Sequence, residues 1–95
     1  MEEVVENHNE NYEINEDRKN SWITINGHCN KLAFTCAYVH ELYILGHNNY
    51  IHGEGTTLVG WIIILGHNNS VWNLKVKKMQ VLGHNNTFKN LKINS

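Results

Sequence analysis

Imidazole and thiolate groups are common zinc ligands, and this chain places a histidine in every copy of a short repeat. The string Gly-His-Asn-Asn occurs three times, and a weaker copy, Gly-His-Cys-Asn, precedes them. If the repeats stack, equivalent positions lie about 4.8 Å apart, and their imidazoles form a column along one edge. The members of this histidine column are His28, His47, His67 and His84, with His8 as an extension by one further repeat.

Such a column is a candidate zinc site. Zn–N bonds of about 2.0–2.1 Å let two neighbouring imidazoles converge on one ion after small rotamer changes, and two pairs from two chains complete a tetrahedron. Cys29 stands beside His28 and near His47, so it can add a thiolate. Copper and nickel also suit imidazole. The fold itself requires no cofactor.

The alternative interpretation is that Gly-His-Asn-Asn is a good turn sequence copied with each repeat. Duplication alone aligns residues, so the alignment of the histidines is weak evidence for a site. No acidic side chain is placed by the pattern to orient the rings. The spacing also matches no zinc-finger or zincin motif. Both interpretations stay open from the sequence.

The elements that carry this column are predicted by a period of about 20 residues. The repeat glycines Gly27, Gly46, Gly66 and Gly83 are 19, 20 and 17 residues apart, a spacing typical of a solenoid. Apolar residues recur two and four positions before each glycine and five after it, which is the alternation of a strand with one buried face. These residues are Ile25, Ile44, Ile64 and Val81; Ile23, Leu42, Ile62 and Met79; and Leu32, Ile51, Val71 and Phe88.

The turn between strands is predicted from the motif itself. Glycine is expected to let the backbone adopt conformations closed to other residues. The second Asn of each motif stands two residues before the next inward position, so its side chain should point inward. There it can bond its equivalents in neighbouring coils and the turn backbone. These asparagines are Asn30, Asn49, Asn69 and Asn86.

Over residues 21–95 the chain resembles the right-handed parallel β-helix class, and more narrowly short-coil helices with a Gly-x-Asn-Asn-x-(Ile/Val) repeat. The resemblance implies an all-β solenoid of about four to five coils of 17–20 residues. Pectate-lyase-like members of the class use carboxylates and calcium on long helices, whereas only Glu41 and Glu54 lie within these repeats. Bactofilin-like short helices are non-enzymatic and polymerise end to end, which suits the length better.

The N-terminal segment differs in composition from the repeats. Residues 1–20 hold seven of the nine acids, and we expect them to form an acidic cap or a degenerate first coil before the β-helix repeats of residues 21–95. A disordered tail is the alternative. Three apolar positions fall in phase with the next coil, namely Val5, Tyr12 and Ile14 with Ile25, Leu32 and Phe34.

Outward positions of the strands form an apolar strip. Positions one, three and five before each glycine should face solvent, and in the later coils many of them are apolar. A large exposed apolar patch usually marks an interaction site, and a second copy of the chain is the expected partner. A loop or the N-terminal segment folded over the strip is the alternative. The strip consists of Tyr43, Leu45, Trp61, Ile63, Leu65 and Leu82.

Composition limits the function classes. A net charge of −1 argues against nucleic-acid binding, and no apolar run reaches the roughly 18 residues of a membrane helix. Two cysteines and the acidic start suggest an intracellular, cytoplasmic protein. No catalytic residues are predicted, so the chain is expected not to be an enzyme.

Three functional hypotheses follow. The first is a structural self-association module that forms a homodimer. The second is a zinc-binding module in which the histidine column pairs two chains. The third, a carbohydrate-acting β-helix protein, rests on fold analogy alone.

Overall fold

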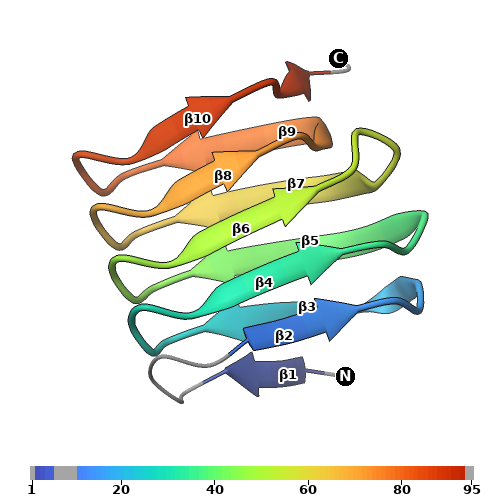
Figure 1. Cartoon of the computed structure of the whole chain (residues 1–95), viewed down its shortest axis with the longest axis horizontal. Helices are drawn as coiled ribbons and strands as arrows, with labels where there is room; N and C mark the ends of the chain where they lie inside the picture. Colours follow the sequence, from blue (N-terminus) through green and yellow to red (C-terminus); the bar gives the residue numbers. More distant parts are fainter. Residues whose placement is uncertain (1, 6–10, 94–95) are drawn as a thin grey trace.

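The computed structural model describes residues 2–5 and 11–93, and in them the chain forms a parallel β-solenoid of about four turns. Figure 1 shows one set of strands in front and a second set behind, with the chain rising from the N-terminus to the C-terminus as a right-handed coil. The all-β solenoid predicted from the glycine period is confirmed. No helix that could cross a membrane is found among the described residues.

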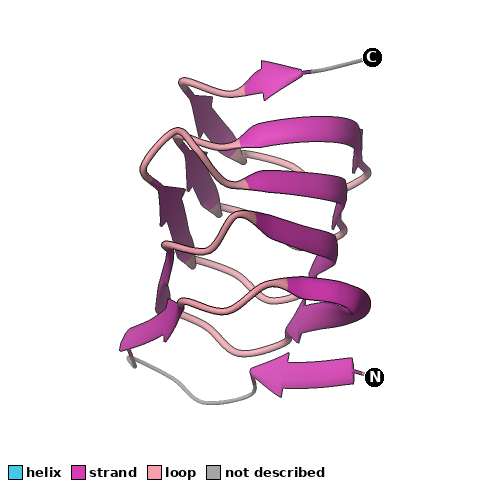
Figure 2. Ribbon diagram, turned by 90° about the vertical axis from the view of Figure 1, so that its right-hand side faces the viewer, coloured by secondary structure: helices cyan, strands magenta, loops and turns pink. Residues whose placement is uncertain are grey.

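Two parallel sheets make up the coils (Figures 1 and 2). The six-stranded sheet contains β1 (Glu2–Val5), β3 (Arg18–Ile25), β5 (Tyr38–Ile44), β7 (Leu58–Ile64), β9 (Lys75–Val81) and β11 (Lys92–Ile93). The five-stranded sheet contains β2 (Asn11–Ile14), β4 (Lys31–Phe34), β6 (Tyr50–Gly53), β8 (Ser70–Trp72) and β10 (Thr87–Lys89).

The register of the sheets places each repeat directly on the next. Ile25 pairs with Ile44, Ile44 with Ile64, and Ile64 with Val81. β1 and β2 join the sheets at one end, where Val5 pairs with Ile25. His8 lies outside the described residues.

The core is the row of inward side chains between the two sheets. Nine of the twelve predicted core positions have no solvent exposure, which confirms the alternation in the sequence. The other three belong to the last coil, where Met79 and Phe88 are partly buried and Val81 is 37% exposed. Burial of these aliphatic side chains is the main favourable term for folding.

The strands of the six-stranded sheet bend partway along their length (Figure 2). In β5 the buried residues Val39 and Leu42 flank two successive outward residues, His40 and Glu41. Strict alternation would bury one of that pair. The same doubled outward position occurs at Gly60 and Trp61 of β7, so the bend is stacked from coil to coil.

Buried asparagines hold the turn after each repeat glycine. The side chain of Asn49 donates from Nδ2 to the carbonyl oxygen of Gly27, at 3.0 Å, and its Oδ1 accepts from the backbone N–H of Asn30, also at 3.0 Å. Asn69 makes the same two kinds of bond one coil further on, to Gly46 and Asn49. The inward orientation predicted for the second Asn is confirmed.

The repeat glycines have a different role from the one predicted. The left-handed residue of each turn is the one two positions later: φ is 59° at Cys29, 56° at Asn48 and Asn68, and 57° at Asn85. Asn tolerates this region better than most residues, which explains the first Asn of the motif. The glycine is required instead for close approach, because a Cβ on Gly46 would lie 1.8 Å from the carbonyl oxygen of Gly27.

Substitution of Asn49 by Ala tests the buried asparagines. Asn49→Ala leaves the Asn30 N–H and the Gly27 carbonyl without their partners in a buried turn, and each such group costs about 1–3 kcal/mol. We therefore expect the free energy of unfolding, measured in urea, to fall by about 2–4 kcal/mol. The matched control Asn26→Ala, at an exposed position, should change it by less than about 0.5 kcal/mol. Equal effects of the two variants would contradict the assigned role.

Candidate functional site

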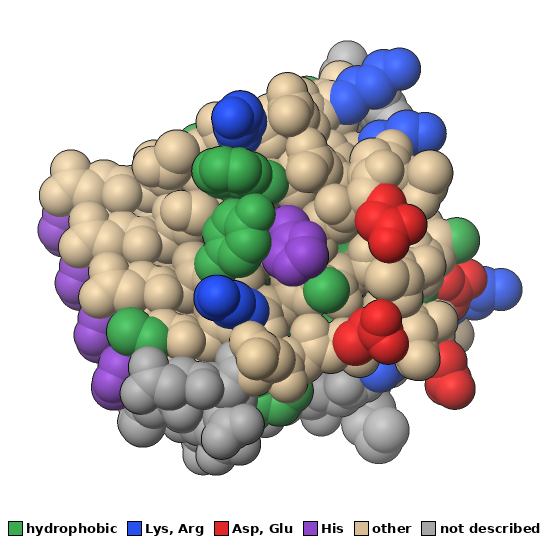
Figure 3. All heavy atoms as spheres, viewed as in Figure 1, with side chains coloured by type: hydrophobic (Ala, Val, Ile, Leu, Met, Phe, Trp, Pro, Cys, Tyr) green, Lys and Arg blue, Asp and Glu red, His purple; other side chains and the backbone are tan. Residues whose placement is uncertain are grey.

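The histidine column lies on the turns that follow the six-stranded sheet, and Figure 3 shows it as a row along one edge of the molecule. The rings are stacked face to face. Successive centroids are 4.9 Å apart for His28 and His47, 5.2 Å for His47 and His67, and 5.1 Å for His67 and His84. The planes of each pair differ by no more than 10°. The fixed coil spacing therefore sets the spacing of the imidazoles.

This stacking bears directly on metal binding. Equivalent nitrogens of parallel rings are separated by about the centroid distance, whereas two nitrogens on one zinc are at most about 4.2 Å apart. Neighbouring rings must therefore rotate before they can share an ion. Over the described residues, no group of three or more His, Cys, Asp and Glu side chains is arranged to hold a metal. Cys29 is exposed at the end of the column, where its N–H donates to the His47 carbonyl.

The apolar strip lies on the outer face of the six-stranded sheet, next to the histidine column. Its leucines form one row, with Leu45 40% exposed, Leu65 49% and Leu82 66%. Trp61 is 37% exposed in a parallel row. Tyr43 and Ile63 are half-buried between these rows. All six residues lie on or beside β5, β7 and β9, within three successive coils.

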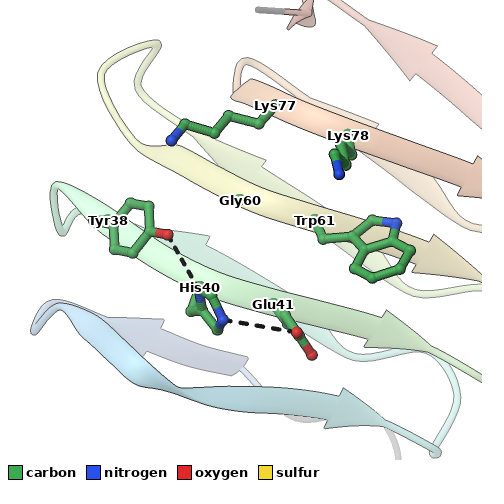
Figure 4. A pocket seen from close by; sticks show the side chains of 7 residues that line it. All are labelled: Tyr38, His40, Glu41, Gly60, Trp61, Lys77 and Lys78. Atoms are coloured by element: carbon green, nitrogen blue, oxygen red, sulfur yellow. Dashed lines mark hydrogen bonds and ion pairs between the residues drawn. The ribbon is translucent and has the colours of Figure 1, made fainter. Parts of the chain in front are cut away.

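A pocket of about 220 Å³ lies on the same sheet, at the bend of the strands (Figure 4). Gly60 leaves the space open because it has no side chain, and a Cβ there would lie 2.5 Å from the His40 carbonyl oxygen. We refer to this hollow as the Gly60 pocket. Its lining is completed by Tyr38, His40 and Glu41 from β5, Trp61 from β7, and Lys77 and Lys78 from β9.

The polar groups of the Gly60 pocket are linked along β5. The Tyr38 hydroxyl is 3.2 Å from Nδ1 of His40, and His40 Nε2 is 3.7 Å from a carboxylate oxygen of Glu41. The other carboxylate oxygen of Glu41 accepts a hydrogen bond of 2.6 Å from Tyr43. The carboxylate is thus engaged on both sides. The pocket consequently offers a phenol, an imidazole and two amines to a ligand.

Sequence reasoning missed this pocket because it assumed strict alternation through each strand. The signal was present as two polar residues between apolar ones, His40-Glu41 between Val39 and Leu42. Gly60 in an otherwise apolar strand was a second signal, since a glycine inside a strand often marks a place where another group approaches closely.

The five-stranded sheet carries a smaller cluster of aromatic residues on its outer face. Tyr50 stacks on His52 at 5.0 Å and meets the edge of Trp72 at 5.3 Å. Lys89 Nζ lies 4.8 Å above the Trp72 ring. Among the described residues, the buried Nε1 of Trp72 meets no hydrogen-bond partner. These side chains pack against one another on the outer face of the sheet.

Comparison of the chain with models of protein families, with curated proteins and with solved structures gives no match. Function is therefore argued from the geometry of these surfaces.

The two thiols should differ in reactivity. Burial raises the pKa of the Cys36 thiol, and the nearby Asp17 carboxylate adds to the effect, so little thiolate is present at pH 8. Cys29 is exposed. In a disulfide-exchange assay at pH 8 we expect Cys29→Ser to abolish the fast phase and Cys36→Ser to leave it intact. Fast labelling of the Cys29→Ser variant would show that Cys36 is accessible and contradict the assignment.

Proposed function

We propose that this chain is a non-enzymatic structural module that associates with a second copy of itself through the apolar strip. The observation that carries the proposal is the row of Leu45, Leu65 and Leu82, which repeats an exposed leucine in three successive coils. Solvent-exposed leucines placed side by side make a contiguous apolar patch, and such patches are typical of interfaces. Contact with another surface removes them from water.

The charges beside the strip support a second copy as the partner. Glu41, Trp61 and Lys78 pair in register across β5, β7 and β9, so a carboxylate and an amine stand on opposite sides of the tryptophan. A two-fold axis along β7 sets Trp61 against its own copy. The same axis brings Glu41 of each chain opposite Lys78 of the other. This arrangement makes the surface self-complementary in charge, as a two-fold interface requires.

Leu65→Lys tests this interface. The variant places two ammonium groups at the centre of the proposed contact, where burial of unpaired charge is costly. We expect wild-type protein to sediment as a dimer at tens of micromolar and Leu65→Lys as a monomer. Thr87→Lys adds the same charge on the opposite sheet and should remain dimeric. A wild-type monomer, or an unchanged Leu65→Lys dimer, would refute the proposal.

Zinc-mediated pairing is the second candidate, and the position of the histidine column favours it. The rings border the row of leucines, so the two-fold axis along β7 brings His67 of one chain near His67 of the other. Two rings from each chain supply four ligands, the usual number for zinc. Two neighbouring rings of a column reach a shared zinc ion by rotation of their side chains, which is a smaller change than a rearrangement of the turn backbone.

Sedimentation with EDTA and with stoichiometric zinc separates the two candidates. Zinc pairing predicts a monomer in EDTA that doubles in mass with zinc, and loss of the effect in a double variant with His47→Gln and His67→Gln. His52→Gln removes a histidine outside the column and serves as the control. A dimer of equal stability under both conditions would make the histidine column incidental to association.

A further inference from the structure

We propose that the Gly60 pocket binds the phosphate monoester group of a small molecule whose ring lies against Trp61. This inference does not rest on self-association. It starts from the position of Gly60, whose equivalents in the neighbouring coils, His40 and Lys77, both carry side chains. A Cβ at position 60 would meet the His40 carbonyl oxygen, so the close approach of β5 selects glycine there, and the pocket exists in this coil because that residue has no side chain.

The groups around the hollow are suited to an anion. Lys77 and Lys78 approach it from β9, while the Tyr38 hydroxyl and the His40 ring approach it from β5 (Figure 4). Neither lysine takes part in an ion pair with a carboxylate over residues 11–93. The sequence has no acid after Glu54, so the lysines meet no carboxylate from their own coil.

Glu41 is the one acidic group of the pocket, and its contacts reduce its repulsion of an anion. One oxygen accepts from Tyr43 at 2.6 Å and the other faces His40 Nε2 at 3.7 Å. In the tautomer that carries its proton on Nδ1, the His40 ring donates to the Tyr38 oxygen. The Tyr38 hydroxyl is then free to donate to a ligand.

A phosphate monoester fits these donors better than a carboxylate. It carries about −1.5 to −2 charges at pH 7 and three acceptor oxygens, which match two amines and a hydroxyl that approach from different strands. A carboxylate offers two oxygens in one plane. Lysine binds phosphate as a point charge, without the planar geometry that arginine imposes.

Trp61 and the size of the hollow define the rest of the ligand. The indole forms one wall, and Lys78 Nζ lies 5.9 Å from its ring centroid. A ring stacked on the indole therefore places its phosphate beside that amine. The volume of about 220 Å³ is below the range of about 300–1,000 Å³ for sites that hold drug-sized molecules. The ligand is accordingly a phosphorylated single ring or a molecule of similar size.

The experiment titrates the whole chain with phenyl phosphate and follows the indole N–H signals of the three tryptophans by NMR. We expect saturation at millimolar ligand, with the Trp61 signal shifting and those of Trp22 and Trp72 unchanged. A double variant with Lys77→Gln and Lys78→Gln should bind at least tenfold more weakly. The control, Lys31→Gln with Lys92→Gln, removes the same charge from exposed positions and should bind normally.

Two further titrations, one with a second ligand and one with a second protein variant, complete the experiment. Inorganic phosphate lacks a ring and should bind at least tenfold more weakly than phenyl phosphate. Leu65→Lys repeats the titration with the proposed interface disrupted, so saturation in either protein supports the pocket even where association covers it. Failure to saturate in both proteins overturns the proposal. The proposal is also overturned if phenyl phosphate and inorganic phosphate bind with equal affinity, or if the two double lysine variants lose the same amount of affinity. Either result would indicate nonspecific ion binding.

Discussion

The contact between a glycine carbonyl and the coil above it is the constraint on which the other features depend. At each turn the carbonyl oxygen of Gly27 or its equivalent occupies the place where a side chain on the next glycine would lie. The second Asn of that next motif then donates to the same oxygen. Glycine and asparagine therefore act together: one leaves room for the carbonyl and the other satisfies it. A buried carbonyl without such a donor would be costly.

This contact also determines where surface groups lie. Once the glycines are stacked, the residue after each one projects from the same edge, which produces the column of imidazoles. The residue before each one forms the row of leucines, and the fifth residue before it forms the row of Glu41, Trp61 and Lys78. The proposed interface and the Gly60 pocket share Trp61 because both are built from neighbouring rows. Occupation of one surface is expected to influence the other.

The sequence was sufficient to predict the sheets and the core, because inward residues such as Ile25, Ile44 and Ile64 repeat at a fixed phase. It was insufficient for the bend, since two successive outward residues such as His40 and Glu41 look like ordinary polar positions in a one-dimensional pattern. The role of glycine was also mistaken for a conformational one. Both strained turns and close approach select glycine, and only the positive φ at Asn48 and Asn68 separates them. The proximity of Tyr38 and Lys77 depends on how three strands stack, so no short stretch of sequence predicts it.

The exposed core of the last coil has a consequence for how the molecule opens. In the part of the chain that the structure describes, each strand pairs with the strands directly above and below it in the same sheet, so cooperativity passes from coil to coil in one dimension. Over the described residues β9 is paired with β11 at Lys75 and Val76, and the inward side chains of Met79, Val81 and Phe88 are less covered than their counterparts in the preceding coils. Local opening of this coil therefore costs less free energy than opening at β5 and β7, whose amides exchange only when several coils separate together.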